Sequence, residues 1–373
     1  MTRRRLVLTL AIALVGLQAG AAPRAKAPKN VILLIGDGMG FAQTTLGRIA
    51  LGTNDATLRL DSMSHGGMVK TYPLDTPDKR VVITDSAAAA TALATGHKTK
   101  NGMIAMLPDG AKLKTVLEAA QDKGKRVGLV TTVTISHATP AGFGAHVPSR
   151  GQETDIAAQY LDRKIDVLLG GGEAMFVPQS VAGSKRKDDR DLLAEARRLG
   201  YTVARTKDEM DRVHSGKILG LFAMEAMKTE PPEPSLAEMT AKALDLLGSN
   251  KNGFFLMSEG GQIDWGSHAN NGPMTVKQML DFDAAIGVAL DFARKRGDTL
   301  VVLTADHETG GLALVGATAG TTAPYSMAWG SKGHSATVVP LLADGPGAEL
   351  FSGVLNNTDI PKRIAKLMGL NLN

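Results

Sequence analysis

The sequence predicts an α/β protein with a mostly parallel central β-sheet and helices on both faces. Short apolar runs alternate with amphipathic helical patterns along most of the 373 residues, which is typical of that class. Several of these runs are continuously apolar rather than alternating, as expected of parallel strands that are covered on both faces. The chain shows no internal repeat and no shift in composition, so we expect a single domain over residues 22–373.

The individual elements follow from the same patterns. Apolar runs are expected to form strands at residues 31–35, 127–132, 165–169, 217–222, 254–257, 299–303 and 338–342. Apolar residues at helical spacing form two of the expected helix faces, one from Leu113, Val116, Leu117 and Ala120 and the other from Phe282, Ile286, Ala289 and Ala293. The polar stretches at 183–191 and 229–235 are expected to be surface loops.

Composition excludes several classes of protein. A chain with 43% hydrophobic and 21% charged residues is globular rather than disordered, collagen-like or coiled-coil. The absence of cysteine excludes disulfides, thiolate metal sites and a cysteine nucleophile. The formal net charge of +5 falls to +2 without the three arginines at positions 3–5, so charge gives no support for nucleic-acid binding.

The first 21 residues have the three-part pattern of a secretory signal peptide. Three arginines at positions 3–5 precede a twelve-residue apolar run at 6–17, and Ala19-Gly20-Ala21 provides a small-x-small cleavage site. Twelve residues are too few for a membrane-spanning helix. A buried N-terminal helix is the alternative interpretation, and the arginines also loosely resemble a twin-arginine export signal. We expect cleavage near Ala21 or Ala22 and a periplasmic or secreted protein with no membrane anchor.

Residues of the types that bind metals follow four of the expected strands. They are Asp37 after the run at 31–35, His137 and Thr139 after 127–132, Glu259 and Asp264 after 254–257, and Asp306 and His307 after 299–303. Each acidic residue alone could be a turn or cap residue. Ligands of open α/β sheets, however, bind at the carboxyl ends of strands, so we expect these side chains to converge. Without cysteine, a Zn²⁺ site there must use imidazole and carboxylate groups.

A serine lies at the start of an expected helix between residues 84 and 96. The alanine run at 87–90 has the highest helix propensity, and Gly96 is a plausible end of the helix. Ser86 could simply be the N-cap of this helix. Alternatively, its hydroxyl lies among free backbone N–H groups that suit an anion, and a base or metal could make it a nucleophile.

At these residues the sequence resembles the alkaline phosphatase family, specifically its exported bacterial members. The resemblance runs from about Asn30 to the C-terminus. Its most specific parts are Asp-Ser-Ala-Ala at 85–88, Glu-Gly-Gly-Gln-Ile-Asp at 259–264 and Asp-His-Glu-Thr-Gly-Gly at 306–311, in this order. It implies an alkaline-phosphatase-like fold and metal-dependent hydrolysis of phosphate monoesters at alkaline pH, through a phosphoserine intermediate that releases inorganic phosphate.

The resemblance also assigns roles to individual positions. Ser86 matches the nucleophile, and Arg150 matches the arginine that binds the phosphate; alone, Arg150 would be interpreted as a solvated surface residue. The implied cofactors are two Zn²⁺ and one Mg²⁺. The implied ligands are Asp264, His268 and His334 for one zinc; Asp37, Asp306, His307 and the Ser86 oxygen for the second; and Asp37, Thr139 and Glu259 for magnesium. Mixed imidazole and carboxylate sets suit Zn²⁺, and an all-oxygen set suits Mg²⁺.

Two positions differ from some members of the family. An aspartate can stand where this chain has His137, and a lysine where it has Trp265. His137 is therefore either a direct metal ligand or a residue beside the magnesium ligands, since a nitrogen ligand favours softer metals. Trp265 leaves no ammonium group near the phosphate, which predicts that the product is held less tightly.

Other functions remain open at this level. A phosphodiesterase or sulfatase of the same superfamily would use a threonine or a modified cysteine where this chain has Ser86. A phosphate- or metal-binding protein without turnover is a further alternative, against which Ser86 argues. The resemblance also suggests a homodimer, with small phosphate monoesters as the other partners, although no segment identifies an interface.

Overall fold

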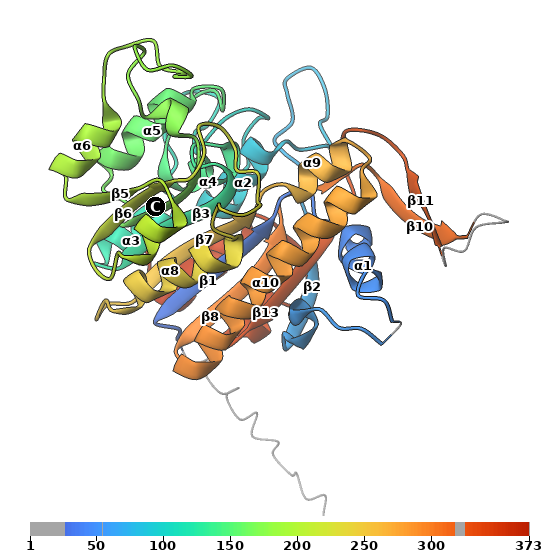
Figure 1. Ribbon diagram of the computed structural model, residues 1–373. Helices are drawn as coiled ribbons and strands as arrows, with labels where there is room; N and C mark the ends of the chain where they lie inside the picture. The colour runs from blue at the N-terminus through green and yellow to red at the C-terminus, as the bar shows by residue number, and fades with distance from the viewer. Residues whose placement is uncertain (1–26, 54, 318–324, 373) are drawn as a thin grey trace, which may run out of the picture.

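The computed structural model describes residues 27–53, 55–317 and 325–372, and it confirms the predicted α/β architecture. A ten-stranded sheet in the order β14-β2-β13-β8-β1-β7-β3-β4-β6-β5 forms the centre, with helices packed on both of its faces (Figure 1). The expected signal peptide and its cleavage site lie outside the described residues. Within the described part of the chain, no helix combines the length and the apolar character needed to cross a membrane.

Seven neighbouring strands of the sheet are parallel. They are β1 (Asn30–Gly36), β3 (Arg126–Thr134), β4 (Val167–Gly171), β5 (Tyr201–Ala204), β6 (Lys217–Leu221), β7 (Phe254–Gly260) and β8 (Thr299–Ala305). The strands β1, β7 and β8 at the centre are buried along their whole length. This burial on both faces explains their continuously apolar sequences.

The remaining strands differ from the sequence expectation in direction or in number. The expected strand at 338–342 is β13 (Val339–Asp344), which runs antiparallel to β8 and to β2 (His65–Lys70); β14 (Gly353–Asn356) pairs with the far side of β2. The strands β2, β5 and β14 were not predicted. Two glycines and partial exposure hide the pattern of β2, while β5 and β14 have only four residues each.

Small paired strands lie outside the main sheet. A hairpin of β10 (Leu312–Gly316) and β11 (Tyr325–Trp329) projects from the body of the molecule (Figure 1). A second pair joins β9 (Glu308–Thr309) to β12 (His334–Ser335). Neither was predicted from the sequence, because each strand has five residues or fewer and no alternating pattern.

The helices form a layer on each face of the sheet. Phe254 in β7 contacts Phe292 in α10, while the next residue, Phe255, contacts Phe143 in α4. Successive side chains of a strand point to opposite faces, so α10 and α4 cover opposite sides. The α-helices are α1 (Phe41–Ile49), α2 (Ser86–Thr95), α3 (Val116–Asp122), α4 (Ala138–Gly144), α5 (Glu153–Asp162), α6 (Leu192–Arg198), α7 (Lys207–Asp211), α8 (Leu236–Gly248), α9 (Ile263–His268), α10 (Gly272–Arg296) and α11 (Asp359–Met368).

Both expected helix faces are present, with one difference. The face at 282–293 is buried within α10, which ends at Gly297 in the left-handed conformation that favours glycine. Leu113, expected on the face of the other helix, lies before that helix begins. The side chain of Thr115 accepts a hydrogen bond from the Glu118 amide, while the carboxylate of Glu118 accepts one from the Thr115 amide, and this capping box sets the start of α3 at Val116.

The alanine-rich helix α2 is buried at all ten of its positions. It packs against α4 so closely that a Cβ atom placed on Gly142 would lie 2.8 Å from the Cβ atom of Ala90. Only small side chains fit between these two helices. The alanine run therefore has two effects: it favours helix formation, and it lets α2 lie close to α4. This packing also sets the position of Ser86, the first residue of α2.

A larger side chain in this contact should destabilise the fold. We expect Ala90→Leu to lower the free energy of unfolding by about 1–3 kcal/mol, because the added atoms have no space beside Gly142. Chemical denaturation of the variant and the wild type measures the difference. Ala284→Leu, on the exposed side of α10, is the matched control and should change stability little. Equal stability of Ala90→Leu and the wild type would show that α2 and α4 are not closely packed.

Candidate metal centre and nucleophile

The carboxyl ends of three central strands bring the predicted ligands together, as the sequence predicts. β1 lies between β7 and β8, with Ile35 opposite Glu259 and Gly36 opposite Ala305. Asp37 directly follows β1, and Asp306 directly follows β8. Because the strands are parallel and in register, their ends meet at one edge of the sheet.

The first cluster consists of Asp264, His268 and His334. The Nε2 atoms of the two histidines are 3.1 Å apart, and Oδ1 of Asp264 lies 3.3 Å from Nε2 of His268 and 3.7 Å from Nε2 of His334. Ligands placed tetrahedrally about 2.0 Å from Zn²⁺ are separated by about 3.3 Å. The three atoms thus already have the spacing of a zinc site.

Backbone carbonyl groups orient both histidines of the first cluster. Nδ1 of His268 is hydrogen-bonded to the carbonyl oxygen of Lys332, and Nδ1 of His334 lies 2.8 Å from that of Thr84. A carbonyl accepts only, so each Nδ1 carries the proton and Nε2 faces the cluster. Without a metal, the hydrogen bond to Asp264 raises the pKa of His268 to about 9. The cluster therefore requires positive charge, from a proton or from a metal ion.

The second cluster consists of Asp37, Asp306 and His307, all fully buried. Nε2 of His307 lies 3.2 Å from Oδ2 of Asp306 and 3.6 Å from Oδ1 of Asp37. Both oxygens of Asp37 and Oδ2 of Asp306 lack a hydrogen-bond partner among the described residues. Burial, followed by the repulsion of nearby carboxylates, raises the pKa of Asp37 well above its usual value and that of Asp306 to about 7. Unpartnered buried oxygens of this kind fit a cation.

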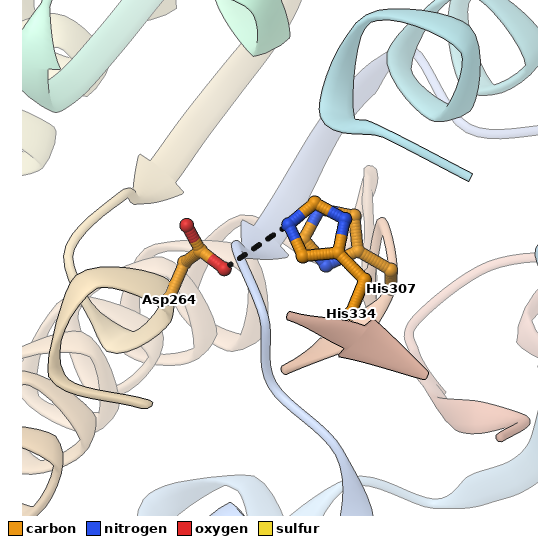
Figure 2. Close-up of side chains that lie close together, drawn as sticks. All are labelled: Asp264, His307 and His334. Carbon is orange, nitrogen blue, oxygen red and sulfur yellow. Dashed lines mark ion pairs between the residues drawn. The ribbon is translucent and has the colours of Figure 1, made fainter. Parts of the chain in front are cut away.

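The two clusters adjoin each other through His307. Its ring stacks on the ring of His334, with the centroids 3.5 Å apart, and it also groups with Asp264 and His334 as a possible metal-binding set (Figure 2). Burial lowers the pKa of His307 to about 4, so the ring is neutral and its nitrogen can act as a ligand. The structure thus places the first and second clusters side by side.

The third cluster groups Asp37 with His137 and Glu259. Oε1 of Glu259, the Thr139 hydroxyl and Nδ1 of His137 are buried without a hydrogen-bond partner in the described structure. The other oxygen of Glu259 accepts a hydrogen bond of 2.5 Å from Thr131. Burial raises the pKa of Glu259 to about 7. Asp37 belongs to both this cluster and the second, so it can bridge two cations.

The position of Ser86 corrects the interpretation of this serine as a helix cap. The N-cap of α2 is Asp85, whose Oδ1 accepts a hydrogen bond of 2.9 Å from the amide of Ala88. Ser86 is the first residue of α2, and its Oγ lies 3.3 Å from Nε2 of His307. Because the neighbouring carboxylate caps the helix, the serine hydroxyl is free to face the second cluster.

Arg150 reaches the same region from the loop after α4. Its Nη1 donates to Oδ2 of Asp85 at 3.3 Å, and its Nη2 donates to Nε2 of His137 at 3.1 Å. Its backbone amide donates to the carbonyl of Gly102, whose own amide donates to Asp85. Burial and the nearby guanidinium lower the pKa of His137 to about 3, so this imidazole is neutral and can accept. The arginine is held against the site rather than solvated at the surface.

Glu308 is a supporting residue to which the sequence analysis gave no role. Its side chain is 4% exposed and accepts hydrogen bonds from Gln43 in α1 and from the hydroxyl of Ser335, the residue after His334. A Cβ atom on Gly40 would lie 2.4 Å from Cγ of Glu308, so glycine is needed there. Glu308 lies within the Asp-His-Glu-Thr-Gly-Gly motif at 306–311. Its place between metal-binding residue types and the glycines of this motif is the sequence feature that could have indicated a role.

A second supporting residue is Thr309. Its hydroxyl donates to Oδ1 of Asp264 at 2.5 Å and lies 3.3 Å from Nδ1 of His307. It therefore links the first cluster to the second. Asp85 and Thr131 were likewise not singled out. These residues position other side chains, and such a role leaves no separate spacing pattern in a sequence.

Comparison with known proteins agrees with this geometry. The family model described as alkaline phosphatase matches residues 28–328. Alkaline phosphatase 3 of Bacillus subtilis is 36% identical, covering 97% of this chain and 96% of the relative. The structure of alkaline phosphatase from the Antarctic bacterium TAB5 is 38% identical, with a TM-score of 0.84, and covers 93% of this chain and 100% of that one. A variant of the TAB5 enzyme with one histidine replaced by aspartate has Mg bound in its M3 site; it is 36% identical, with a TM-score of 0.82 and the same coverage.

The pKa values of the metal-free carboxyl groups predict how metals stabilise the protein. Glu259 and Asp306, with pKa values near 7 in the folded chain, ionise near pH 4 in the unfolded chain. A folded pKa above the unfolded one means that metal-free stability falls as pH rises from about 4 to about 7. Bound cations offset this loss. Zn²⁺ and Mg²⁺ added to chelator-treated protein should therefore raise Tm more at pH 8 than at pH 5.

Scanning calorimetry of metal-free and metal-loaded protein at both pH values measures the effect. The metal-free protein at each pH is its own control for pH effects elsewhere in the chain. If added metal raises Tm equally at pH 5 and pH 8, or more at pH 5, the result would contradict the placement of these carboxyl groups around cations.

Proposed function

The chain belongs to the alkaline phosphatase family and hydrolyses phosphate monoesters, and we propose that it does so through a phosphoserine formed on Ser86. The observation that carries the proposal is the position of the Ser86 hydroxyl, 3.3 Å from Nε2 of His307, where the second cluster adjoins the first. The Asp85 cap leaves this hydroxyl available. In the first step its oxygen would bond to phosphorus while the bond from phosphorus to the leaving alcohol breaks. Water would then attack the phosphoserine, releasing inorganic phosphate and restoring Ser86.

We assign two Zn²⁺ and one Mg²⁺ to the three clusters. The first cluster, with two imidazoles and a carboxylate, and the second, with one imidazole and two carboxylates, have the donor sets that suit zinc. Asp37, Thr139 and Glu259 provide oxygen donors that suit magnesium. When bound, these ions supply charge neutralisation for the phosphoryl oxygens and make the serine hydroxyl and a water molecule easier to deprotonate.

His137 would lie beside the magnesium ligands and orient Arg150. Its Nε2 already accepts a hydrogen bond from the arginine, which leaves Nδ1 as the nitrogen that could face a cation. A nitrogen ligand favours softer metals than magnesium. We therefore keep the oxygen donors as the magnesium set and give His137 the positioning role.

Arg150 would bind the phosphoryl group. Two of its nitrogens are held by Asp85 and His137, so its orientation is fixed before substrate arrives. A guanidinium group can donate two parallel hydrogen bonds to a phosphate dianion. Preorganised donors of this kind stabilise the charge that develops in the transition state.

Export and self-association complete the proposal. The signal-peptide pattern over residues 1–21 supports a periplasmic or secreted enzyme with one catalytic domain over residues 22–373. Mass spectrometry of the mature N-terminus tests the expected cleavage.

Exposed apolar side chains on the loop before Ser86 support a homodimer; they are Tyr72, Leu74, Val82 and Ile83. Light scattering of the purified protein tests the dimer, which Val82→Asp should weaken if this loop forms the interface.

Ser86→Ala should remove the covalent step. We expect kcat for a simple monoester to fall by several orders of magnitude while inorganic phosphate still binds, because the metal ligands and Arg150 remain. Steady-state kinetics and acid-quenched mass spectrometry of the phosphoenzyme measure both effects. Ser180→Ala, at an exposed position, is the control. A near-normal kcat in Ser86→Ala, or a phosphoryl group on another residue, would contradict the assignment.

Arg150→Ala should affect monoesters more than diesters. A diester has an alkyl group in place of one phosphoryl oxygen, so it can accept fewer hydrogen bonds from the guanidinium group. A charge-assisted hydrogen bond contributes about 1.5–3 kcal/mol, which corresponds to a loss of roughly 10–150-fold in kcat/KM for the monoester.

The measurement is kcat/KM for both ester types at one pH and fixed metal concentration. Arg190→Ala, which breaks the surface ion pair with Glu195, is the matched control. An equal loss of kcat/KM for both esters would mean that Arg150 supports the fold or the overall electrostatic field of the site rather than binding the phosphoryl group.

A further inference from the structure

A cavity of about 450 Å³ opens beside the third cluster. His137, which belongs to that cluster, forms part of its lining, and Trp265 forms another part. Arg150 contacts His137 at 3.1 Å, so a phosphoryl group bound by the arginine lies next to this cavity. The volume is within the range of about 300–1,000 Å³ that is usual for small-molecule sites.

The cavity combines an aromatic wall with apolar side chains. Trp265 follows the cluster residue Asp264 in α9 and is 37% exposed, although large aromatic side chains are usually more buried. Its indole N–H has no hydrogen-bond partner within the described residues, so it can donate to a ligand. Met175 and Met227, 8% and 3% exposed, also line the cavity, and methionine makes favourable contacts with aromatic rings.

The charged groups of the cavity leave it slightly acidic. Lys185 is paired with Glu225 at 2.8 Å. Glu153 also lines the cavity, and one of its oxygens accepts hydrogen bonds from Thr134 and Ser136 at 2.8 and 2.7 Å. The lining residues themselves carry one cation and two carboxylates, so this wall of the cavity, unlike the adjoining Arg150 and metal clusters, disfavours a second negatively charged group. It is thus suited to an uncharged ligand.

We propose that this cavity binds the leaving group of the phosphate monoester, with Trp265 selecting uncharged planar aromatic leaving groups. The inference rests on the proposed function, because it requires the phosphoryl group to be bound at Ser86 and Arg150. The leaving group is joined to that phosphoryl group through a single oxygen, and the proposal places it in the adjoining cavity. An aromatic ring there can stack on the exposed indole face, whereas a small alkyl group cannot.

Kinetics with two monoesters test the proposal on the metal-loaded full chain. The probes are 1-naphthyl phosphate and ethyl phosphate, and the readout is the ratio of their kcat/KM values in each variant. The intrinsic reactivity of each ester cancels when a variant is compared with the wild type. We expect Trp265→Ala to lower the naphthyl-to-ethyl ratio roughly 10-fold and Trp265→Phe, which keeps an aromatic face, to retain most of it.

Leu199→Ala is the matched control, because Leu199 is exposed to a similar extent (38%) and does not line the cavity. Its ratio should equal that of the wild type. If Trp265→Ala lowers kcat/KM for both esters by the same factor, or leaves the ratio unchanged, the leaving group does not contact Trp265 and the inference is wrong. A wild type that cleaves neither ester would instead refute the proposed function.

The selection against negative charge has its own test. Wild type should cleave phenyl phosphate with a higher kcat/KM than 4-carboxyphenyl phosphate, and Glu225→Gln should narrow that difference, because it removes one of the two carboxylates. An unchanged difference in Glu225→Gln would show that the charged leaving group does not enter the cavity.

Discussion

The burial of several carboxylates close to one another is the constraint on which the rest of this structure depends. Asp37, Glu259 and Asp306 are fully buried at the carboxyl ends of adjacent parallel strands, and several of their oxygens have no protein partner. Uncompensated buried charge is costly, and the raised pKa values of these groups express that cost. Bound cations remove the cost and keep the groups ionised. The parallel register of β1 with β7 and β8 brings the three carboxylates together.

Around this centre, a second set of residues positions the side chains of the three clusters, Ser86 and Arg150. Asp85 caps α2 and orients Arg150, so the Ser86 hydroxyl is free to face the second cluster. Glu308 connects α1 to the short strand that carries His334, and Thr309 connects Asp264 to His307. These contacts give each ligand a fixed orientation before a metal or substrate arrives. Such preorganisation reduces the rearrangement that is required during the reaction.

The sequence predicted the parts of the structure whose signals are local. Continuous apolar runs indicated the buried strands, and polar residues at their ends indicated where the site would form. The antiparallel direction of β13 could not be predicted, because an apolar run is the same in either direction. The glycines of β2 concealed that strand. Ser86 and Asp85 are both good cap residues, and only the hydrogen bond to the Ala88 amide distinguishes their roles. Glu308 acts through its neighbours, so its role became visible only in three dimensions.

The most direct test of the metal assignment is anomalous diffraction from crystals of the metal-loaded protein, recorded on both sides of the zinc absorption edge. The account predicts one zinc peak among Asp264, His268 and His334 and a second among Asp37, Asp306 and His307, beside the Ser86 hydroxyl. It predicts density without a zinc signal between Asp37 and Glu259, as expected of magnesium. A single zinc peak, or zinc bound away from these residues, would contradict the central claim.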